Sequence, residues 1–116
     1  MPKITLYVKP TCSTCRQAVQ IVKESGQEFE AVPYFEKRFT KAKLRELVDK
    51  LGLPAPELLR TKEDTFKALK VEASKLSPGE VVDLMLKHPE LIQRPIAEKG
   101  GKVILARPSE KVRELL

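Results

Sequence analysis

The 116-residue chain has no tryptophan, and only 5% of its residues are aromatic, so aliphatic side chains must form most of its core. It has two cysteines and a single histidine, which are too few for the tetrahedral ligand set of a structural zinc site. No apolar run is nearly as long as the stretch of about 20 residues that a membrane-spanning helix needs. These absences favour one compact domain over residues 1–116, with no metal and no membrane span.

Basic residues outnumber acidic ones, 22 against 16, and the formal net charge of +6 favours anionic partners. The lysines are spread over predicted helix surfaces, and no zinc finger or aromatic stacking platform accompanies them. We therefore expect a solvated basic surface rather than a nucleic-acid-binding one. Because Met1-Pro2-Lys3 runs straight into a predicted strand, we expect no targeting segment and a cytoplasmic protein, with a monomer as the default state.

The two cysteines enclose the segment C-S-T-C between a predicted strand and a predicted helix. This spacing puts Cys12 at the start of the helix and Cys15 one turn in, on the same face. Free backbone N–H groups and the helix dipole favour a thiolate at Cys12, and Lys9 and Arg16 add positive charge nearby. We hypothesise that Cys12 is the nucleophile and that Cys15 resolves it by forming a Cys12–Cys15 disulfide.

Two alternatives stay open for the cysteine pair. With His88 as a distant third ligand, the pair still falls short of a zinc site. A static structural disulfide suits a secreted mini-protein, whereas Cys-x-x-Cys between a strand and a helix is typical of a redox motif in a cytosolic chain. Redox chemistry is the interpretation that the residues favour.

Hydrophobic periodicity predicts the order β-α-β, then a helical insert, then β-β-α. The first strand, helix and strand are predicted at residues 3–8, 13–25 and 28–35, the insert helices at 40–51, 56–59, 65–69 and 77–88, a hairpin within 91–106 with its turn at 98–101, and a last helix at 109–116. Thr40 and Ser77 are predicted helix caps, and Glu80 completes a capping-box pattern with Ser77. The opening β-α-β predicts a parallel strand pair with a right-handed crossover.

This order, with Cys-x-x-Cys after the first strand, resembles the thioredoxin and glutaredoxin fold. Three further segments carry a closer resemblance: Leu-Leu-Arg at 58–60, Leu-Ile-Gln-Arg-Pro-Ile at 91–96 and Ala-Arg-Pro-Ser at 106–109. In this order and at this distance from Cys12, they resemble the glutaredoxin-fold arsenate reductases over essentially the whole chain. The resemblance implies a single α/β domain with a four-stranded mixed sheet and a helical insert at about residues 40–90.

The resemblance also implies that Cys12 attacks arsenate while Arg60, Arg94 and Arg107 hold the oxyanion. Guanidinium groups suit this task, because they neutralise a largely dianionic tetrahedral ion and bind its oxygens in a fixed fork. Phosphate and sulfate are expected to compete for the same site. Pro95 stands where the fold family places a cis-proline facing the nucleophile loop, and we expect a cis peptide bond there.

The chain departs from the glutathione-coupled arsenate reductases in two places. Residues 8–10 are Val-Lys-Pro where those proteins have His-Asn-Pro, and Cys15 is an additional cysteine. Lys9 is expected to replace part of the electrostatic effect of the missing histidine. We expect an enzyme without a bound cofactor, whose Cys12–Cys15 disulfide is reduced by glutathione and glutaredoxin, by thioredoxin or by another low-molecular-weight thiol.

Two other functions stay open. Cys-x-x-Cys also occurs in the related Spx-type regulators, which bind RNA polymerase and use the pair as a redox switch. A general glutaredoxin-like thiol oxidoreductase needs the cysteines alone. The Arg-Pro-Ser setting of Arg107 favours an arsenate reductase, because Spx-type regulators differ there and a general oxidoreductase has no use for three converging arginines.

Overall fold

The computed structural model describes residues 3–116, which form two compact units. The first comprises Met1–Lys37 and Arg94–Leu116, and the second comprises Arg38–Gln93. The helical insert predicted at about residues 40–90 corresponds to the second unit, while the single domain over residues 1–116 stays a prediction. Met1 and Pro2, on which the expectation of no targeting segment depends, lie outside the described residues.

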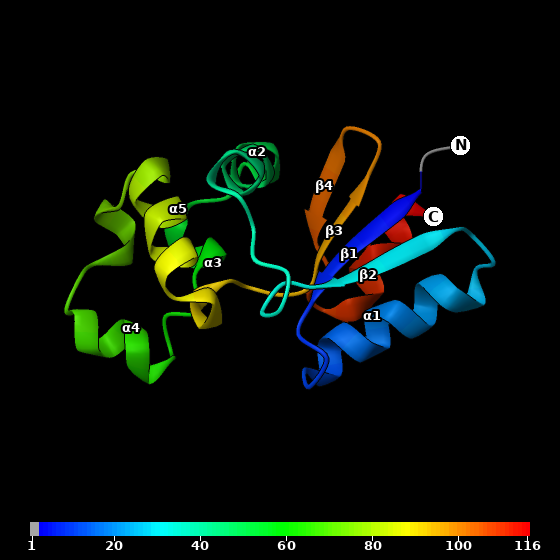
Figure 1. Ribbon diagram of the computed structural model, residues 1–116, viewed down its shortest axis with the longest axis horizontal. Coiled ribbons are helices and arrows are strands. Elements are labelled where there is room, and N and C mark those ends of the chain that lie inside the picture. The colour runs from blue at the N-terminus through cyan, green and yellow to red at the C-terminus, as the bar shows by residue number, and fades with distance from the viewer. Residues whose placement is uncertain (1–2) are drawn as a thin grey trace. The chain divides into compact units, whose positions relative to one another are not determined.

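The first unit is built on a four-stranded sheet with the strand order β2-β1-β3-β4 (Figure 1). Its strands are β1 (Ile4–Val8), β2 (Phe29–Pro33), β3 (Ile96–Lys99) and β4 (Lys102–Leu105). β1 runs parallel to β2 and antiparallel to β3, and β3 runs antiparallel to β4. The predicted α/β fold with a four-stranded mixed sheet is confirmed.

Helix α1 (Ser13–Glu24) and the 3-10 helix η3 (Ser109–Leu115) contact each other and pack on one face of this sheet (Figure 1). Alternation along β1 directs Ile4, Leu6 and Val8 into this layer, where each is at most 5% exposed. The other buried members of the layer are Cys15, Ala18, Val22, Ala97, Ala106, Val112 and Leu115. Burial of each larger aliphatic side chain stabilises the unit by about 1.5–3 kcal/mol, and it fixes the loop between β1 and α1.

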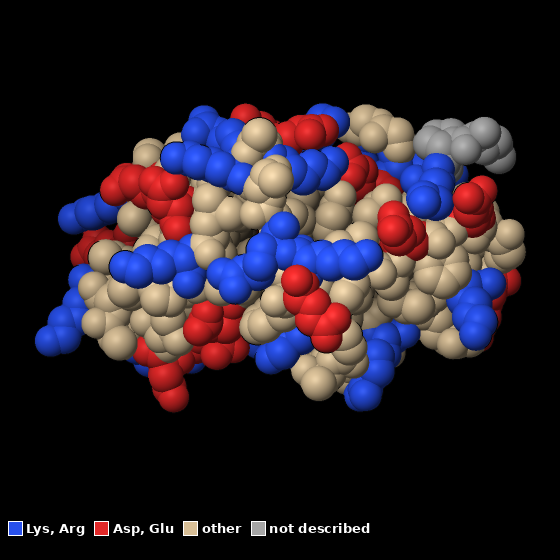
Figure 2. All heavy atoms as spheres, in the orientation of Figure 1, with Lys and Arg blue, Asp and Glu red and all other residues tan. Residues whose placement is uncertain are grey.

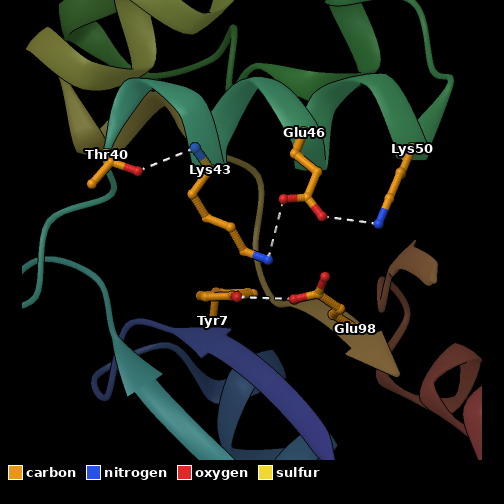
Figure 3. A network of polar contacts seen from close by, with 6 residues as sticks. All are labelled: Tyr7, Thr40, Lys43, Glu46, Lys50 and Glu98. Carbon is orange, nitrogen blue, oxygen red and sulfur yellow. Dashed lines mark hydrogen bonds and ion pairs between the residues drawn. The ribbon is translucent and has the colours of Figure 1, made fainter. Parts of the chain in front are cut away.

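Tyr7 alternates to the other face of β1. Its hydroxyl donates a hydrogen bond of 3.0 Å to Glu98 Oε1 on β3 (Figure 3). The bond joins the first strand of the chain to the hairpin that follows the insert.

Two strand ends differ from the prediction by more than one residue. β2 ends at Pro33 rather than at residue 35, because the N–H groups of Glu36 and Lys37 donate to the Pro33 carbonyl at 2.9 Å each and turn the chain. β3 continues to Lys99, so the hairpin turn is shorter than the predicted 98–101. Gly100 has a φ of 61°, which permits this tight turn without steric cost.

The second unit contains α2 (Lys41–Leu51), α3 (Ala55–Leu58), α4 (Asp64–Leu69) and α5 (Pro78–Lys87), with the 3-10 helices η1 (Ala73–Lys75) and η2 (Pro89–Leu91). α2 and α5 contact each other. Their buried residues are Leu44, Leu47, Val48, Val81, Val82 and Met85. Periodicity predicts the four α-helices to within one residue at each end, but it does not predict η1 and η2, since a single 3-10 turn is too short to show a period. The last predicted helix, at 109–116, forms as the 3-10 helix η3.

Both long helices of the second unit begin at the predicted caps. Thr40 Oγ1 accepts a hydrogen bond of 3.1 Å from the Lys43 backbone N–H (Figure 3). Ser77 Oγ accepts from the Glu80 N–H at 3.2 Å, and Glu80 Oε1 accepts from the Ser77 N–H at 2.9 Å. This reciprocal pair is the predicted capping box.

Charged side chains of both signs are interspersed on the surface. On the face drawn in Figure 2, acidic side chains lie between the basic ones. Along α2, Glu46 forms ion pairs with Lys43 at 3.7 Å and Lys50 at 2.9 Å (Figure 3). Such exposed pairs contribute little to stability, and they fit the solvated basic surface that the sequence predicts.

Candidate active site

Cys12 is the N-cap residue of α1, immediately after the loop that leaves β1. Its backbone N–H donates to the Lys9 carbonyl at 2.9 Å, and its carbonyl accepts the first helical bond from the Arg16 N–H at 3.1 Å. These two bonds fix the cysteine backbone between loop and helix. The Cys12 side chain is half-buried, Cys15 one turn on is 1% exposed, and both are free thiols.

The pKa of Cys12 is the outcome of opposing effects. Partial burial alone would raise the pKa of the thiol, because a low-dielectric environment disfavours the thiolate. Although the sulfur does not form a regular N-cap hydrogen bond, its interactions with the backbone N–H and thiol of Cys15 and with the Arg94 guanidinium outweigh burial. Together they lower the pKa of Cys12 from its ordinary value of 9.0 to about 7. A large fraction of Cys12 is therefore the nucleophilic thiolate at neutral pH.

The pKa of Cys15 is shifted in the opposite direction, above its ordinary value. Burial raises the pKa of its thiol to about 12, the Lys9 backbone N–H counteracts part of this effect, and the neighbouring Cys12 adds to it. A thiolate at Cys12 disfavours a second negative charge beside it. At neutral pH a large fraction of Cys12 is therefore an ionised nucleophile, whereas Cys15 is its protonated partner.

Arg94 directly precedes the Pro95 that leads into β3, and only 7% of its surface is exposed, which is rare for an arginine. Across residues 3–116 the structure gives no hydrogen-bond partner to its Nε and Nη1 atoms, which are both buried. A buried donor without a partner costs about 1–3 kcal/mol, and more when it is charged. Two such donors on a guanidinium that also interacts with Cys12 suit an anionic acceptor next to the sulfur.

Arg107 lies beside Arg94. Its Nη1 donates to the Arg94 carbonyl oxygen at 3.1 Å, which joins the segment that follows β4 to the segment that precedes β3. Arg107 is exposed, and the peptide bonds Arg94–Pro95 and Arg107–Pro108 are both cis. The expected cis bond before Pro95 is thus confirmed, and the structure places both arginines in the unit that holds the cysteines.

The other two predicted site residues lie elsewhere. The Lys9 ammonium lies 4.9 Å from the centre of the Phe35 ring. Its backbone N–H, and not the ammonium, lowers the pKa of Cys15. Arg60 belongs to the second unit, where its Nε donates to Glu63 Oε1 at 3.1 Å and its N–H donates to the Leu91 carbonyl at 2.8 Å. The electrostatic role of Lys9 and the oxyanion role of Arg60 stay predictions.

Tyr34 is a site residue that the sequence analysis does not identify. It lies just beyond β2, is 1% exposed, and is one of the groups that raise the pKa of Arg94. A tyrosine at the end of a strand predicts core packing, so the sequence holds no signal for this effect.

A cavity of about 320 Å³ borders Cys15 in the first unit. Its lining residues are Val8, Pro10, Cys15, Arg16, Val19, Ala31 and Pro33. The walls are mainly aliphatic and contain neither Arg94 nor Arg107, so they are poorly suited to a dianion. Within residues 3–116, no cluster of three or more His, Cys, Asp or Glu side chains could hold a metal ion, and no helix is both long and apolar enough to cross a membrane.

Comparison with known proteins settles the family. Residues 7–115 match the ArsC family profile. The chain belongs to the ArsC family. It is 38% identical to "Uncharacterized protein YfgD" from Escherichia coli (strain K12), over 98% of this chain and 97% of that protein. It is 34% identical to the arsenate reductase of Escherichia coli (strain K12), over 100% of this chain and 82% of that protein.

A solved structure agrees with this assignment. The arsenate reductase from Vibrio cholerae matches with a TM-score of 0.90 at 31% identity, over 99% of this chain and 98% of that chain. The resemblance that the cysteine and arginine segments carry is therefore confirmed at the level of the ArsC family, and the fold is that of the thioredoxin-like ArsC structures.

Proposed function

We propose that this ArsC-family chain is an arsenate reductase that converts arsenate(V) to arsenite(III). The observation that carries the proposal is the pairing of a low-pKa Cys12 with a buried Arg94 whose Nε and Nη1 have no partner in the described part of the chain. A thiolate supplies the electrons, and the guanidinium offsets the repulsion between the thiolate and the oxyanion. Arg107 and, by family resemblance, Arg60 complete the oxyanion site.

The first step forms a sulfur–arsenic bond. The Cys12 thiolate attacks arsenic, and one arsenate oxygen leaves as water after taking up protons from solvent. Arg94 and Arg107 hold the remaining oxygens, and positioning next to the sulfur contributes much of the rate. Arsenic is still in the +5 state in this adduct.

The second step transfers the electrons. The Cys15 sulfur attacks the Cys12 sulfur and loses its proton, the sulfur–arsenic bond breaks, and its electron pair goes to arsenic. Arsenic leaves as arsenite in the +3 state after one further protonation, and a Cys12–Cys15 disulfide remains. An external dithiol or thiol, of the thioredoxin, glutaredoxin or glutathione type, restores the pair by exchange, which suits a cytoplasmic setting.

The cysteine pair itself favours a second candidate, a general glutaredoxin-like thiol oxidoreductase. Cys15 lowers the pKa of Cys12 in the absence of any oxyanion, which is what a disulfide-exchange protein requires. The buried Arg94 argues against this candidate, because exchange between thiols gives its two unpartnered donors no anion to bind.

Thiol and arsenite counting tests the proposal. Pre-reduced protein is mixed with arsenate in the absence of other thiols, and free thiols and arsenite are measured before and after. We expect loss of two thiols and release of one arsenite per chain, with no reaction in Cys12→Ser. If nothing is lost, the assay is repeated with glutathione and glutaredoxin and with a thioredoxin system. Absence of arsenite in all three, together with reduction of a mixed-disulfide substrate, would establish the oxidoreductase instead.

A further inference from the structure

The backbone around Arg60 is fixed within the second unit. Its N–H donates to the Leu91 carbonyl at 2.8 Å, and the N–H of Gln93 donates to the Leu58 carbonyl at 3.2 Å. The Gln93 side chain adds a bond of 3.3 Å from Nε2 to the Leu59 carbonyl. The segment that carries the Arg60 side chain is therefore bonded to one neighbouring segment through both backbone and side-chain groups.

A single carboxylate holds the Arg60 side chain. Its Nε donates to Glu63 Oε1 at 3.1 Å, and the two side chains are 23% and 35% exposed. Glu63 is itself anchored, since its N–H donates to the Arg60 carbonyl and its carbonyl accepts from the Lys67 N–H, at 3.1 Å each. Across residues 3–116, Nη1 and Nη2 of Arg60 have no hydrogen-bond partner. The guanidinium is thus oriented through one nitrogen and keeps the other two for a ligand.

Helix α4 does not explain a glutamate at position 63. Glu63 is the N-cap residue, a position at which Ser, Thr, Asp and Asn are preferred because their short side chains accept from the first turn. Its side chain forms no such cap bond and points back to Arg60 instead. A partly exposed ion pair contributes little to stability, so the main effect of this carboxylate is on the direction of the guanidinium.

We propose that Glu63 is a positioning residue, whose carboxylate holds the Arg60 guanidinium by Nε and so presets Nη1 and Nη2 for the oxyanion. The inference rests on the proposed function, which assigns Arg60 to the oxyanion site. A guanidinium binds a tetrahedral anion through a fixed fork of N–H groups, so its orientation determines the fit. Holding the side chain before the anion arrives removes an ordering cost from binding. Because the carboxylate also repels the anion, orientation and charge predict opposite effects of removing it.

Three variants separate orientation from charge, and calorimetry measures the affinity of each for inorganic phosphate. Glu63→Ala removes the charge and the acceptor, whereas Glu63→Gln removes the charge but keeps an oxygen that can accept from Nε. Glu72→Ala is the matched control, because Glu72 is the N-cap of η1, makes no side-chain cap bond and pairs with Lys75 at 3.3 Å. We expect Glu63→Ala to weaken binding about 2- to 10-fold, the ordering cost of one long side chain. Glu63→Gln and Glu72→Ala should bind at least as tightly as the wild type.

Phosphate affinity in Glu63→Ala that equals or exceeds that of the wild type would overturn the positioning role, and a gain would show that the carboxylate acts on the anion by charge alone. Equal weakening in Glu63→Gln would also overturn it, because the acceptor is still present. In an Arg60→Gln background, Glu63→Ala should have no further effect.

The same titrations keep this inference apart from the proposed function. If the wild type binds no phosphate, or if Arg60→Gln binds it as tightly as the wild type, the inference fails, whereas arsenate reduction is still tested by thiol and arsenite counting. If the wild type binds phosphate but reduces no arsenate, the proposed function fails, and the phosphate affinities still decide the role of Glu63.

A second measurement, on the wild type, covers the case in which Glu63→Ala does not fold. In protein with isotopically labelled arginine, the Nε–H resonance of Arg60 is identified by its loss in Arg60→Gln. We expect this group to exchange its hydrogen more slowly than the Nε–H of the exposed Arg113 before any phosphate is added. Exchange as fast as that of Arg113 would refute a preset guanidinium.

Discussion

The Arg94 guanidinium and the Cys12 thiolate attract each other electrostatically, so each favours the charged form of the other. Burial alone would lower the pKa of Arg94, but the interactions with Tyr34 and Cys12 raise it, so the arginine stays fully charged although it is almost completely buried. The same attraction lowers the pKa of Cys12. The residue that would hold the oxyanion therefore also prepares the nucleophile.

Because the pKa of Cys12 is lowered and that of Cys15 is raised, the two thiols should differ in how their reactivity depends on pH. We expect the rate of Cys12 alkylation by iodoacetamide to rise with pH through a midpoint at about 7, because Cys15 and Arg94 stabilise the thiolate. Cys15, with its pKa raised to about 12, should remain unmodified throughout this range. Mass spectrometry of peptides after brief exposure at graded pH measures both sites. A Cys12 midpoint near 9, like that of a free thiol, would refute the proposed activation.

Arg94 should affect both reactivity and oxyanion binding. Arg94→Gln removes the positive charge, so we expect the alkylation midpoint of Cys12 to rise towards its ordinary value. Loss of charge-assisted bonds should weaken phosphate binding by about 10- to 100-fold, as measured by calorimetry. Arg45→Gln is the matched control, because it removes the same charge from an arginine that pairs with Asp49 on an exposed face of α2. If phosphate binds equally to wild type and Arg94→Gln, the oxyanion site lies elsewhere.

The sequence predicts the elements of this fold well, because the signals are local. Alternating Ile4, Leu6 and Val8 indicate β1, and the Ser77 capping box marks the start of α5 to the residue. Strand ends are less predictable. β2 stops at Pro33 because of a turn closed by downstream N–H groups, and no period in the sequence reports such a turn.

The candidate site is predicted in part. A strand, a loop cysteine and a helix start are enough to predict an activated thiolate at Cys12, and the structure places it at the N-cap. The cause of its activation is not local, since it includes Arg94, which is far from Cys12 along the chain. Tyr34 is missed for the same reason: its effect on the pKa of Arg94 arises only after β1, β2 and β3 have assembled.

The capping box of α5 should stabilise the second unit. Ser77→Ala removes the acceptor for the Glu80 N–H, and we expect the free energy of unfolding to fall by about 1 kcal/mol. Urea denaturation followed by circular dichroism measures this change. Ser74→Ala is a suitable control, because Ser74 is exposed in η1, which has no side-chain cap. Equal effects of the two substitutions would show that the box contributes nothing beyond loss of a hydroxyl.

Cys15 decides whether the reaction finishes inside the protein. In Cys15→Ser the first step is still available, since Cys12 and Arg94 are present, but no internal thiol can attack the Cys12 sulfur. We therefore expect pre-reduced Cys15→Ser to release no arsenite from arsenate on its own, and to regain release when glutathione is added. The alkylation midpoint of Cys12 should be measured alongside, because Cys15 also lowers the pKa of that thiol. Arsenite release by Cys15→Ser without any added thiol would show that another group supplies the second pair of electrons, and a Cys12–Cys15 disulfide would then not be part of the mechanism.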